Sequence, residues 1–505
     1  MNNKMRNYIK YIGLIATVTL FVNCSKILEP EPEGQVALDN LLTTEEGLIT
    51  GVNGIFQPLQ GIFSGTMVQL AGRSSDDTWT WRKETESDIF NIDETFGLIE
   101  TTWENHYRGI TRANTVLDRM LLVESFSSEE MRLLIEGQSK FMRAYYYFNL
   151  VRFYGDVPLV LQEIIVPADG ELPRSPIEDV YAQIKSDLND AVSMLPTSYS
   201  GGNGQELGRP TKYAAMALLA TVNLELEEWG EVVANTEDII GEGSLLENYA
   251  DNFNGSQENG PASIFEVQYG GEIAATTINT RGTYAPPAMQ GGAANLPTDD
   301  TWNGEGGSLS SGNGIVQEYE PGDKRKEVTL AHYDLENFLF PDQPVGSLLY
   351  INKYLNEVDQ PVEQSTWNFP IIRYADVLLM RAEALNEIGY SPNDEAFGLL
   401  NEIRINAGLP AHDASTLGTQ DEFRQALRKE RRVELAFESK RYFDLNRWGI
   451  LEARIQFQMD IKGELTFPSN RLISHPITGK SYFLYPIPLV EFSNNANIQV
   501  QNPGY

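Results

Sequence analysis

Apolar residues recur at helical spacing along most of the chain and predict a mainly α-helical protein. The strongest pattern covers residues 129–154, where apolar positions from Met131 to Phe148 are spaced three or four residues apart. Gly155 follows directly and marks the expected end of this helix. Similar patterns predict further helices over residues 38–60, 103–120, 176–195, 211–228, 231–240, 370–388 and 393–407.

Two pairs of these predicted helices form antiparallel hairpins. Residues 211–228 and 231–240 make one hairpin, and residues 370–388 and 393–407 make the other. Small residues lie where the paired helices cross, as they do in tetratricopeptide units. The spacing is not that of an uninterrupted tandem repeat, so we expect a degenerate form with insertions. The predicted fold is mainly α, built from tetratricopeptide-like helical pairs.

A long segment between the two hairpins, residues 241–369, is rich in Gly, Asn, Pro and Thr. These residues favour turns over helices, and only residues 262–270 alternate in the manner of a short strand. Long irregular segments on a rigid helical scaffold often carry binding residues. We therefore expect a loop-rich insertion that forms the ligand-binding face, between helical regions over residues 38–240 and 370–505.

Residues 419–449 predict one more helical segment. Thr419 and Glu422 have the spacing of a capping box, which satisfies free backbone N–H groups at a helix start. An apolar stripe that includes Phe423 and Phe437 follows at 100° per residue. We therefore expect one face of this segment to point toward the core.

Three charged residues, Glu430, Glu434 and Arg441, lie on the same arc as this apolar stripe. An unpaired buried charge is costly, so such residues need partners. Two inward carboxylates are compatible with acid–base catalysis or a metal site, but no histidine or further carboxylate motif accompanies them. The preferred interpretation is a structural ion-pair network, with partners drawn from Arg373, Arg381, Arg431 and Arg447.

The composition of the 505-residue chain narrows the possible functions. A formal net charge of −33 argues against nucleic-acid binding, which needs a basic surface. Cys24 is the one cysteine, so an intramolecular disulfide and a cysteine-ligated zinc site are excluded. The four histidines are scattered without the spacing of metal ligands. We expect neither a metal ion nor another cofactor.

The N-terminus has the profile of a lipoprotein export signal. Three basic residues precede an apolar run over residues 11–22, which is too short for a comfortable transmembrane helix. Cys24 follows this run, and the residues before it resemble a bacterial lipobox. We expect a signal peptide over residues 1–23, and a lipidated Cys24 with a proline-containing tether over residues 24–37.

Several aromatic residues lie in polar loop segments, whereas Trp103, Trp229 and Trp448 lie on or beside amphipathic helices and are predicted to be core. A sugar ring has an apolar C–H face and a rim of hydroxyl groups, so it suits an aromatic platform with polar neighbours. The alternative is that the loop aromatics fill small cores beneath long loops. The candidate ligand-binding residues are Trp79, Trp81, Trp302, Tyr284, Asp76, Asp77, Asn303 and Arg281.

An enzyme is the other class to consider, because glycoside hydrolysis requires two carboxylates at a defined separation. Asp76 with Asp77, and Asp299 with Asp300, are adjacent pairs, but neighbouring acids often cap turns instead. The sequence contains neither a GxSxG motif nor a Walker loop. We therefore predict no catalytic residues and expect that the protein is not an enzyme.

Several motifs in a shared order resemble the SusD/RagB family of outer-membrane nutrient-uptake lipoproteins. They are the lipobox, SSDDTW at 74–79, WENHYRGITRANTVL at 103–117, FMRAYYYFNLVRFYGDVPL at 141–159, PGDKR at 321–325, RYADVLLMRAEALNE at 373–387, RYFDLNRWG at 441–449 and the C-terminal YPIP and NPGY. Together they extend over nearly the whole chain after the signal peptide. Each motif alone is weak, and the order makes the resemblance specific.

The resemblance implies tetratricopeptide-like helical pairs that support an irregular ligand-binding face. It also implies a lipid anchor at Cys24 in the outer membrane, with the protein facing the cell exterior. The implied function is capture of an oligosaccharide without catalysis and its delivery to a SusC-like TonB-dependent transporter. The alternatives are a peptide-binding uptake lipoprotein of the same family and a surface glycoside hydrolase.

Overall fold

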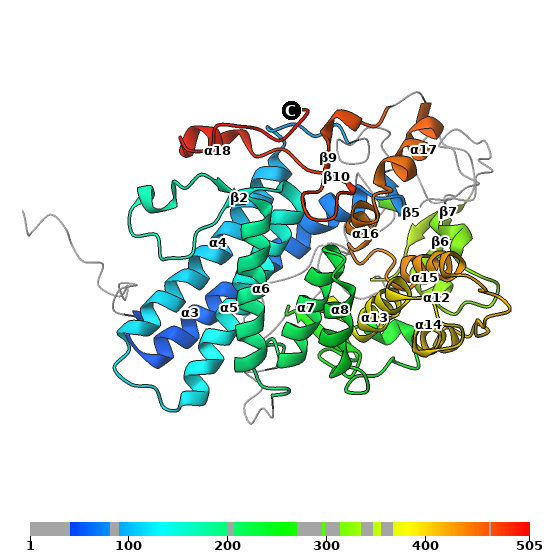
Figure 1. The fold of residues 1–505 in the computed structure, drawn as a ribbon, viewed down its shortest axis with the longest axis horizontal. Helices are drawn as coiled ribbons and strands as arrows, with labels where there is room; N and C mark the ends of the chain where they lie inside the picture. Colours follow the sequence, from blue (N-terminus) through cyan, green and yellow to red (C-terminus); the bar gives the residue numbers. More distant parts are fainter. Residues whose placement is uncertain are drawn as a thin grey trace, which may run out of the picture.

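The computed structural model describes residues 41–80, 90–199, 207–269, 295–297, 314–334, 347–354, 367–463 and 466–505. This part of the chain is mainly helical, as predicted, and its long helices lie side by side (Figure 1). The α-helices are α3 (Glu45–Gly61), α4 (Gly97–Arg119), α5 (Glu129–Tyr154), α6 (Ile177–Met194), α7 (Lys212–Glu225), α8 (Trp229–Glu237), α11 (Ile315–Glu318), α12 (Arg325–Thr329), α13 (Tyr374–Ile388), α14 (Glu395–Asn406), α15 (Gln420–Glu434), α16 (Arg441–Arg447), α17 (Leu451–Gly463) and α18 (Leu489–Asn494).

Short helices of other types continue or connect these elements. Two π-helical turns extend α3, so the chain stays helical from α3 almost to the SSDDTW motif. These turns are η1 (Ile62–Thr66) and η2 (Val68–Gly72), and the 3-10 helices are η3 (Met120–Leu122), η4 (Pro167–Gly170), η5 (Tyr249–Asn252) and η7 (Ser469–Arg471).

Helix α5 shows why the sequence pattern was informative, because its predicted bounds are confirmed. Ser128 caps its start by accepting a hydrogen bond from the backbone N–H of Met131. Gly155, with φ +71°, ends it in a conformation that favours glycine. Almost every residue of its second half is buried, since neighbouring helices α4 and α6 cover it on both sides.

The row of helices continues across the long insertion. Each helix from α3 to α8 packs against the next one along the chain, and α13 then packs directly against α8 although residues 238–373 separate them. In Figure 1 the pairs α7–α8 and α13–α14 lie next to each other. The two predicted hairpins are therefore adjacent members of one helical row, which is the tetratricopeptide-like arrangement expected.

In the described part of the chain, the strands form two-stranded antiparallel pairs. The pairs are β1 (Thr78–Thr80) with β5 (Asn295–Pro297), β2 (Val157–Pro158) with β3 (Arg174–Ser175), β4 (Ser263–Val267) with β8 (Phe369–Arg373), β6 (Leu330–Asp334) with β7 (Ser347–Ile351), and β9 (Leu472–Ser474) with β10 (Ser481–Phe483). The β4–β8 pair closes the base of the insertion, because the chain leaves the helical row at β4 and returns at β8.

Pairing of β4 with β8 also corrects one predicted boundary. Residues 370–388 were expected to be helical throughout, but Phe369–Arg373 form strand β8, and α13 starts at Tyr374. All five residues of β8 are buried, and they pair with the short strand that the sequence predicted near residue 263. Tertiary pairing overrides the helical pattern there.

The segment 419–449 is not one helix, which is a second correction. Thr419 caps α15 as predicted, accepting from the backbone N–H of Glu422 at 3.2 Å. Helix α15 ends at Glu434, however, and both Phe437 and Ser439 have positive φ values, of 63° and 60°. The chain therefore turns before α16 begins, so Arg441 does not continue the face of α15.

Candidate functional site

The β1–β5 strand pair joins one strand from each of the two sequence segments, 76–81 and 281–303, that contain the eight candidate residues. The backbone of Trp79 pairs with that of Leu296, although the two are far apart in the sequence. Residues 78–80 are thereby linked to residues 295–297 through backbone hydrogen bonds. Strand β5 also packs against β7, so the insertion contributes more than one strand to this region.

Five of the eight candidate residues lie outside the described part of the chain, namely Trp81, Arg281, Tyr284, Trp302 and Asn303. Trp79 lies in β1, and its backbone alone is described. Cys24 also lies outside the described residues. The ligand-binding and lipidation roles of these residues stay predictions.

Asp76 and Asp77, directly before β1, are buried and paired with arginines. Arg441 Nε and Arg454 Nε donate to the two carboxylate oxygens of Asp76 at 2.7 and 2.6 Å. Arg432 Nε donates to Asp77 Oδ1 at 2.7 Å, and its Nη2 donates to the backbone oxygen of Asp76 at 2.8 Å. Direct ligand contact by these two carboxylates stays a prediction, and the contacts described here favour a structural role.

The two neighbouring carboxyl groups have opposite pKa shifts. Burial alone would raise the pKa of Asp76, but the positive charges of Arg432, Arg441 and Arg454 outweigh it and lower this pKa. Burial is also the largest influence on Asp77, whose pKa it raises, and the charge of Asp76 adds to that rise against the opposing Arg432. Asp76 is therefore the firmly ionised member that holds the arginines in place.

Hydroxyl groups in the same segment fix its backbone. Ser75 Oγ and Thr78 Oγ1 both donate to the carbonyl oxygen of Gly72, at 2.7 and 2.9 Å. Tyr485, near the C-terminus, donates from its hydroxyl to Ser74 Oγ at 2.7 Å. The polar character of the SSDDTW motif thus reflects buried hydrogen bonds and ion pairs, which place the start of β1 firmly on the helical scaffold.

The inward charges of α15 form a structural ion-pair network, as the preferred interpretation held. Arg325 Nη1 lies 2.7 Å from Glu430 Oε1 and 3.0 Å from Glu434 Oε2. Arg373 Nη1 lies 2.9 Å from Glu434 Oε1. Arg404 Nη1 lies 3.0 Å from Glu430 Oε2. No group of three or more potential metal ligands occurs in the residues that the structure describes.

Sequence reasoning identified only some of the arginine partners. Arg373 pairs with Glu434 as expected, but Arg381 pairs with Glu395, outside this network. Arg325 and Arg404 were missed. Arg325 belongs to the PGDKR motif, which was noticed only as part of the family resemblance. Arg431 and Arg447 belong to an adjoining set of ion pairs, formed with Asp376, Asp444 and Glu383.

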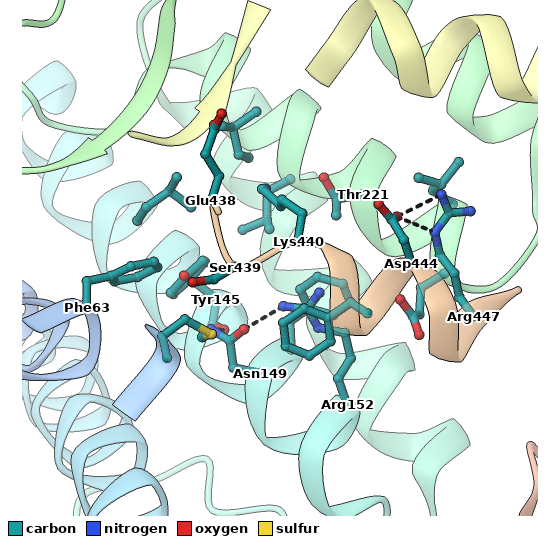
Figure 2. A pocket seen from close by; sticks show the side chains of 18 of the residues that line it. Phe63, Tyr145, Asn149, Arg152, Thr221, Glu438, Ser439, Lys440, Asp444 and Arg447 are labelled. Atoms are coloured by element: carbon teal, nitrogen blue, oxygen red, sulfur yellow. Dashed lines mark hydrogen bonds and ion pairs between the residues drawn. The ribbon is translucent and has the colours of Figure 1, made fainter. Parts of the chain in front are cut away.

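A small cavity of about 50 Å³ lies where α5 and α7 meet residues 438–447 (Figure 2). The guanidinium of Arg152 lies between the rings of Phe148 and Phe443, 3.9 and 3.6 Å from their centroids, and donates to Asn149 Oδ1 at 2.6 Å. Ligand pockets usually measure roughly 300–1,000 Å³. This cavity is a polar part of the core and is too small to hold an oligosaccharide.

Comparison with known families agrees with the motifs found in the sequence. Residues 346–505 match the SusD family, and residues 45–224 match a family described as starch-binding associating with outer membrane. The chain belongs to the SusD/RagB family. The resemblance inferred from the motifs is thus confirmed.

Relatives align along nearly the whole chain. SusD-like protein P2 of Formosa agariphila is 26% identical, over 99% of this chain and 100% of its own length. A SusD superfamily protein from Bacteroides vulgatus has a TM-score of 0.73 and 25% identity, covering 91% of this chain and 99% of its own. A structure titled a laminarin-binding SusD-like protein has a TM-score of 0.68 and 24% identity, covering 91% of this chain and 99% of its own. These structures share the helical fold of the present chain.

Within the described ranges, no helix combines the length and the apolar character that a membrane span requires.

Proposed function

We propose that this protein is a cell-surface lipoprotein that captures an oligosaccharide and passes it, without catalysis, to a SusC-like TonB-dependent transporter of the outer membrane. The observation that carries the proposal is the β1–β5 pair, which joins two segments rich in candidate sugar-binding residues. The family match described as starch-binding and the laminarin-binding relative support a carbohydrate ligand. Because a sugar of this kind is neutral, the net charge of −33 does not oppose its binding.

We assign the aromatic residues of the two joined segments as the stacking platform. In this assignment Trp79, Trp81, Trp302 and Tyr284 stack on apolar sugar faces, while Asn303 and Arg281 bond to hydroxyl groups. The buried acids before β1 act through their arginine contacts, which hold that strand at the edge of the helical scaffold. The scaffold supplies rigidity, and the insertion supplies the contacts.

Affinity electrophoresis in gels containing laminarin or starch tests the ligand class. We expect the native chain to be retarded by at least one of these glucans and to leave it uncut. Trp302→Ala should reduce the retardation by removing a stacking surface, while thermal unfolding stays nearly unchanged. Leu121→Ala is the control, because Leu121 is a large apolar side chain that is 85% exposed on an unrelated connection. Equal retardation of Trp302→Ala and native protein would contradict the assignment of Trp302.

The same samples separate the alternative functions. Reducing ends that accumulate with time, and that disappear in an Asp76→Asn or Asp299→Asn variant, would establish a glycoside hydrolase. Retardation by no glycan, together with binding to a peptide mixture, would favour the peptide-uptake alternative. Cys24→Ala tests the anchor separately, and an unchanged membrane fraction for this variant would contradict lipidation at Cys24.

A further inference from the structure

A cleft of about 400 Å³ lies on the helical row and is formed by well-separated parts of the chain. The α7–α8 turn contributes Glu227, the start of α8 contributes Trp229, the end of α13 contributes Glu387, and α15 contributes Gln425 and Arg428. None of its lining residues belongs to β1 or β5. The volume is within the range of small-molecule pockets, roughly 300–1,000 Å³.

The carboxylates that line this cleft all have basic partners. Glu383 accepts from Arg447 at 2.6 and 2.8 Å and from the indole N–H of Trp448 at 2.8 Å. Glu387 accepts from Arg424 at 2.5 and 2.9 Å. The remaining two acids are paired as well, Asp421 with Arg424 and Glu227 with Lys480.

Arg428 differs from the other bases of the cleft. Among the described residues, no carboxylate lies within ion-pair distance of it, and its buried Nε has no hydrogen-bond partner there. Its guanidinium carbon lies 4.5 Å from the ring centroid of Trp448, which holds the group in place by cation–π attraction. An arginine stays charged even when it is half-buried. The negative charges of Glu383 and Glu387 act on this guanidinium from a distance, but neither carboxylate forms an ion pair with it, so its N–H groups are left for a ligand.

We propose that this cleft binds a carboxylate-bearing sugar, with Arg428 pairing the carboxylate. A guanidinium can donate two parallel hydrogen bonds to the two oxygens of a carboxylate. A neutral sugar has no carboxylate to accept this bidentate pair. The partly exposed indole of Trp229 supplies an apolar wall for the ring, and the exposed amide of Gln425 can bond to its hydroxyl groups. A volume of about 400 Å³ suits a sugar unit rather than a simple ion.

This inference does not depend on the proposed function, because the residues that form the cleft are separate from the candidate glucan-binding residues. Each can therefore be true without the other. A Trp302→Ala variant that loses glucan binding should retain binding in the cleft, and an Arg428 variant should retain glucan binding.

Isothermal titration of the folded chain with trigalacturonate, maltotriose and acetate tests the cleft. We expect binding of trigalacturonate, weakened by about tenfold or more in Arg428→Gln. Arg108→Gln should bind as the native chain does, since Arg108 is exposed on α4 and bonds within its own helix to Asn105. Arg428→Lys keeps the positive charge and should bind with intermediate strength, which separates loss of charge from loss of fold.

Four results would overturn the inference. The first is an absence of trigalacturonate binding in the native chain. The second is equal binding of maltotriose and trigalacturonate, because the carboxylate would then have no role. The third is binding by Arg428→Gln equal to that of the native chain. Acetate binding as tight as that of trigalacturonate would mean that the cleft binds simple carboxylates and does not recognise the sugar ring.

Discussion

The helices around α5 and the helices around α15 build their interiors in different ways. Helix α5 is covered mainly by apolar and aromatic side chains, together with a buried ion pair between Arg143 and Asp187. Three of its buried tyrosines, Tyr146, Tyr147 and Tyr154, direct their hydroxyl groups to backbone oxygens. Tyr146 donates to Ile55 at 2.6 Å, and Tyr154 donates to Ile99 at 2.8 Å. The acceptor is in each case a backbone oxygen, which any residue at that position would supply.

The interior around α15 is held instead by paired charges. Glu434 lies between Arg325 and Arg373, and Arg432 reaches Asp77 across 355 positions of sequence. Each of these contacts requires a particular side chain at a distant position. An apolar interior tolerates exchange of similar side chains, whereas a buried ionic network fails when one partner is lost, because a charge is then left without compensation.

The largest expected effect comes from breaking the ionic interior at its centre. Glu434→Gln keeps the shape of the side chain but removes the charge shared by Arg325 and Arg373. We expect a loss of about 3 kcal/mol or more in the free energy of unfolding, measured by urea denaturation. The matched control is Glu320→Gln, because Glu320 pairs with Arg404 but its side chain is 30% exposed. This control should cost at most about 1 kcal/mol. Equal losses in the two variants would mean that burial does not distinguish these ion pairs.

Acid should weaken the two interiors in successive pH ranges. In α4, burial lowers the pKa of His106 from 6.5 to about 4, and the charge of Arg152 contributes. The unfolded chain therefore binds a proton that the folded chain does not, and stability falls as the pH drops from about 6.5 to 4. Around α15, Arg447 outweighs the effect of burial on Glu383 and lowers its pKa from 4.5 to about 2. Stability from Glu383 is present above pH 4.5 and is lost as the pH drops toward 2.

Each of these two groups changes the free energy of unfolding by about 3 kcal/mol across its whole pH range. Urea denaturation as a function of pH measures both. His106→Gln should flatten the dependence between pH 6.5 and 4 and leave the lower range unchanged, while Glu383→Gln should do the reverse. A dependence on pH that neither substitution changes would assign acid sensitivity to other residues.

The smallest effect is expected inside the aromatic interior. Tyr146→Phe removes one hydroxyl that bonds to the Ile55 carbonyl and keeps the packed ring. We expect a loss of about 1 kcal/mol in the free energy of unfolding by the same urea measurement. A loss as large as that of Glu434→Gln would remove the contrast between the two interiors.

Most of the helices could be predicted because their hydrogen bonds and their apolar periodicity are local. The bounds of α5 and the cap of α15 depend on residues a few positions apart. The family motifs and the inward charges of α15 were also visible in the sequence. The turn after Glu434 could not be predicted from the sequence. Phe437 and Ser439 adopt positive φ values there, which are uncommon for these residue types.

By itself, the sequence determined that this protein is a helical member of its family and that α15 carries charge into the core. Only the tertiary structure decided which arginines meet these charges, that Asp76 and Asp77 are buried, and that β1 pairs with β5. The physical reason is that helix formation follows from neighbours in the chain. Ion pairs and strand pairs instead form between residues that only the folded molecule brings together.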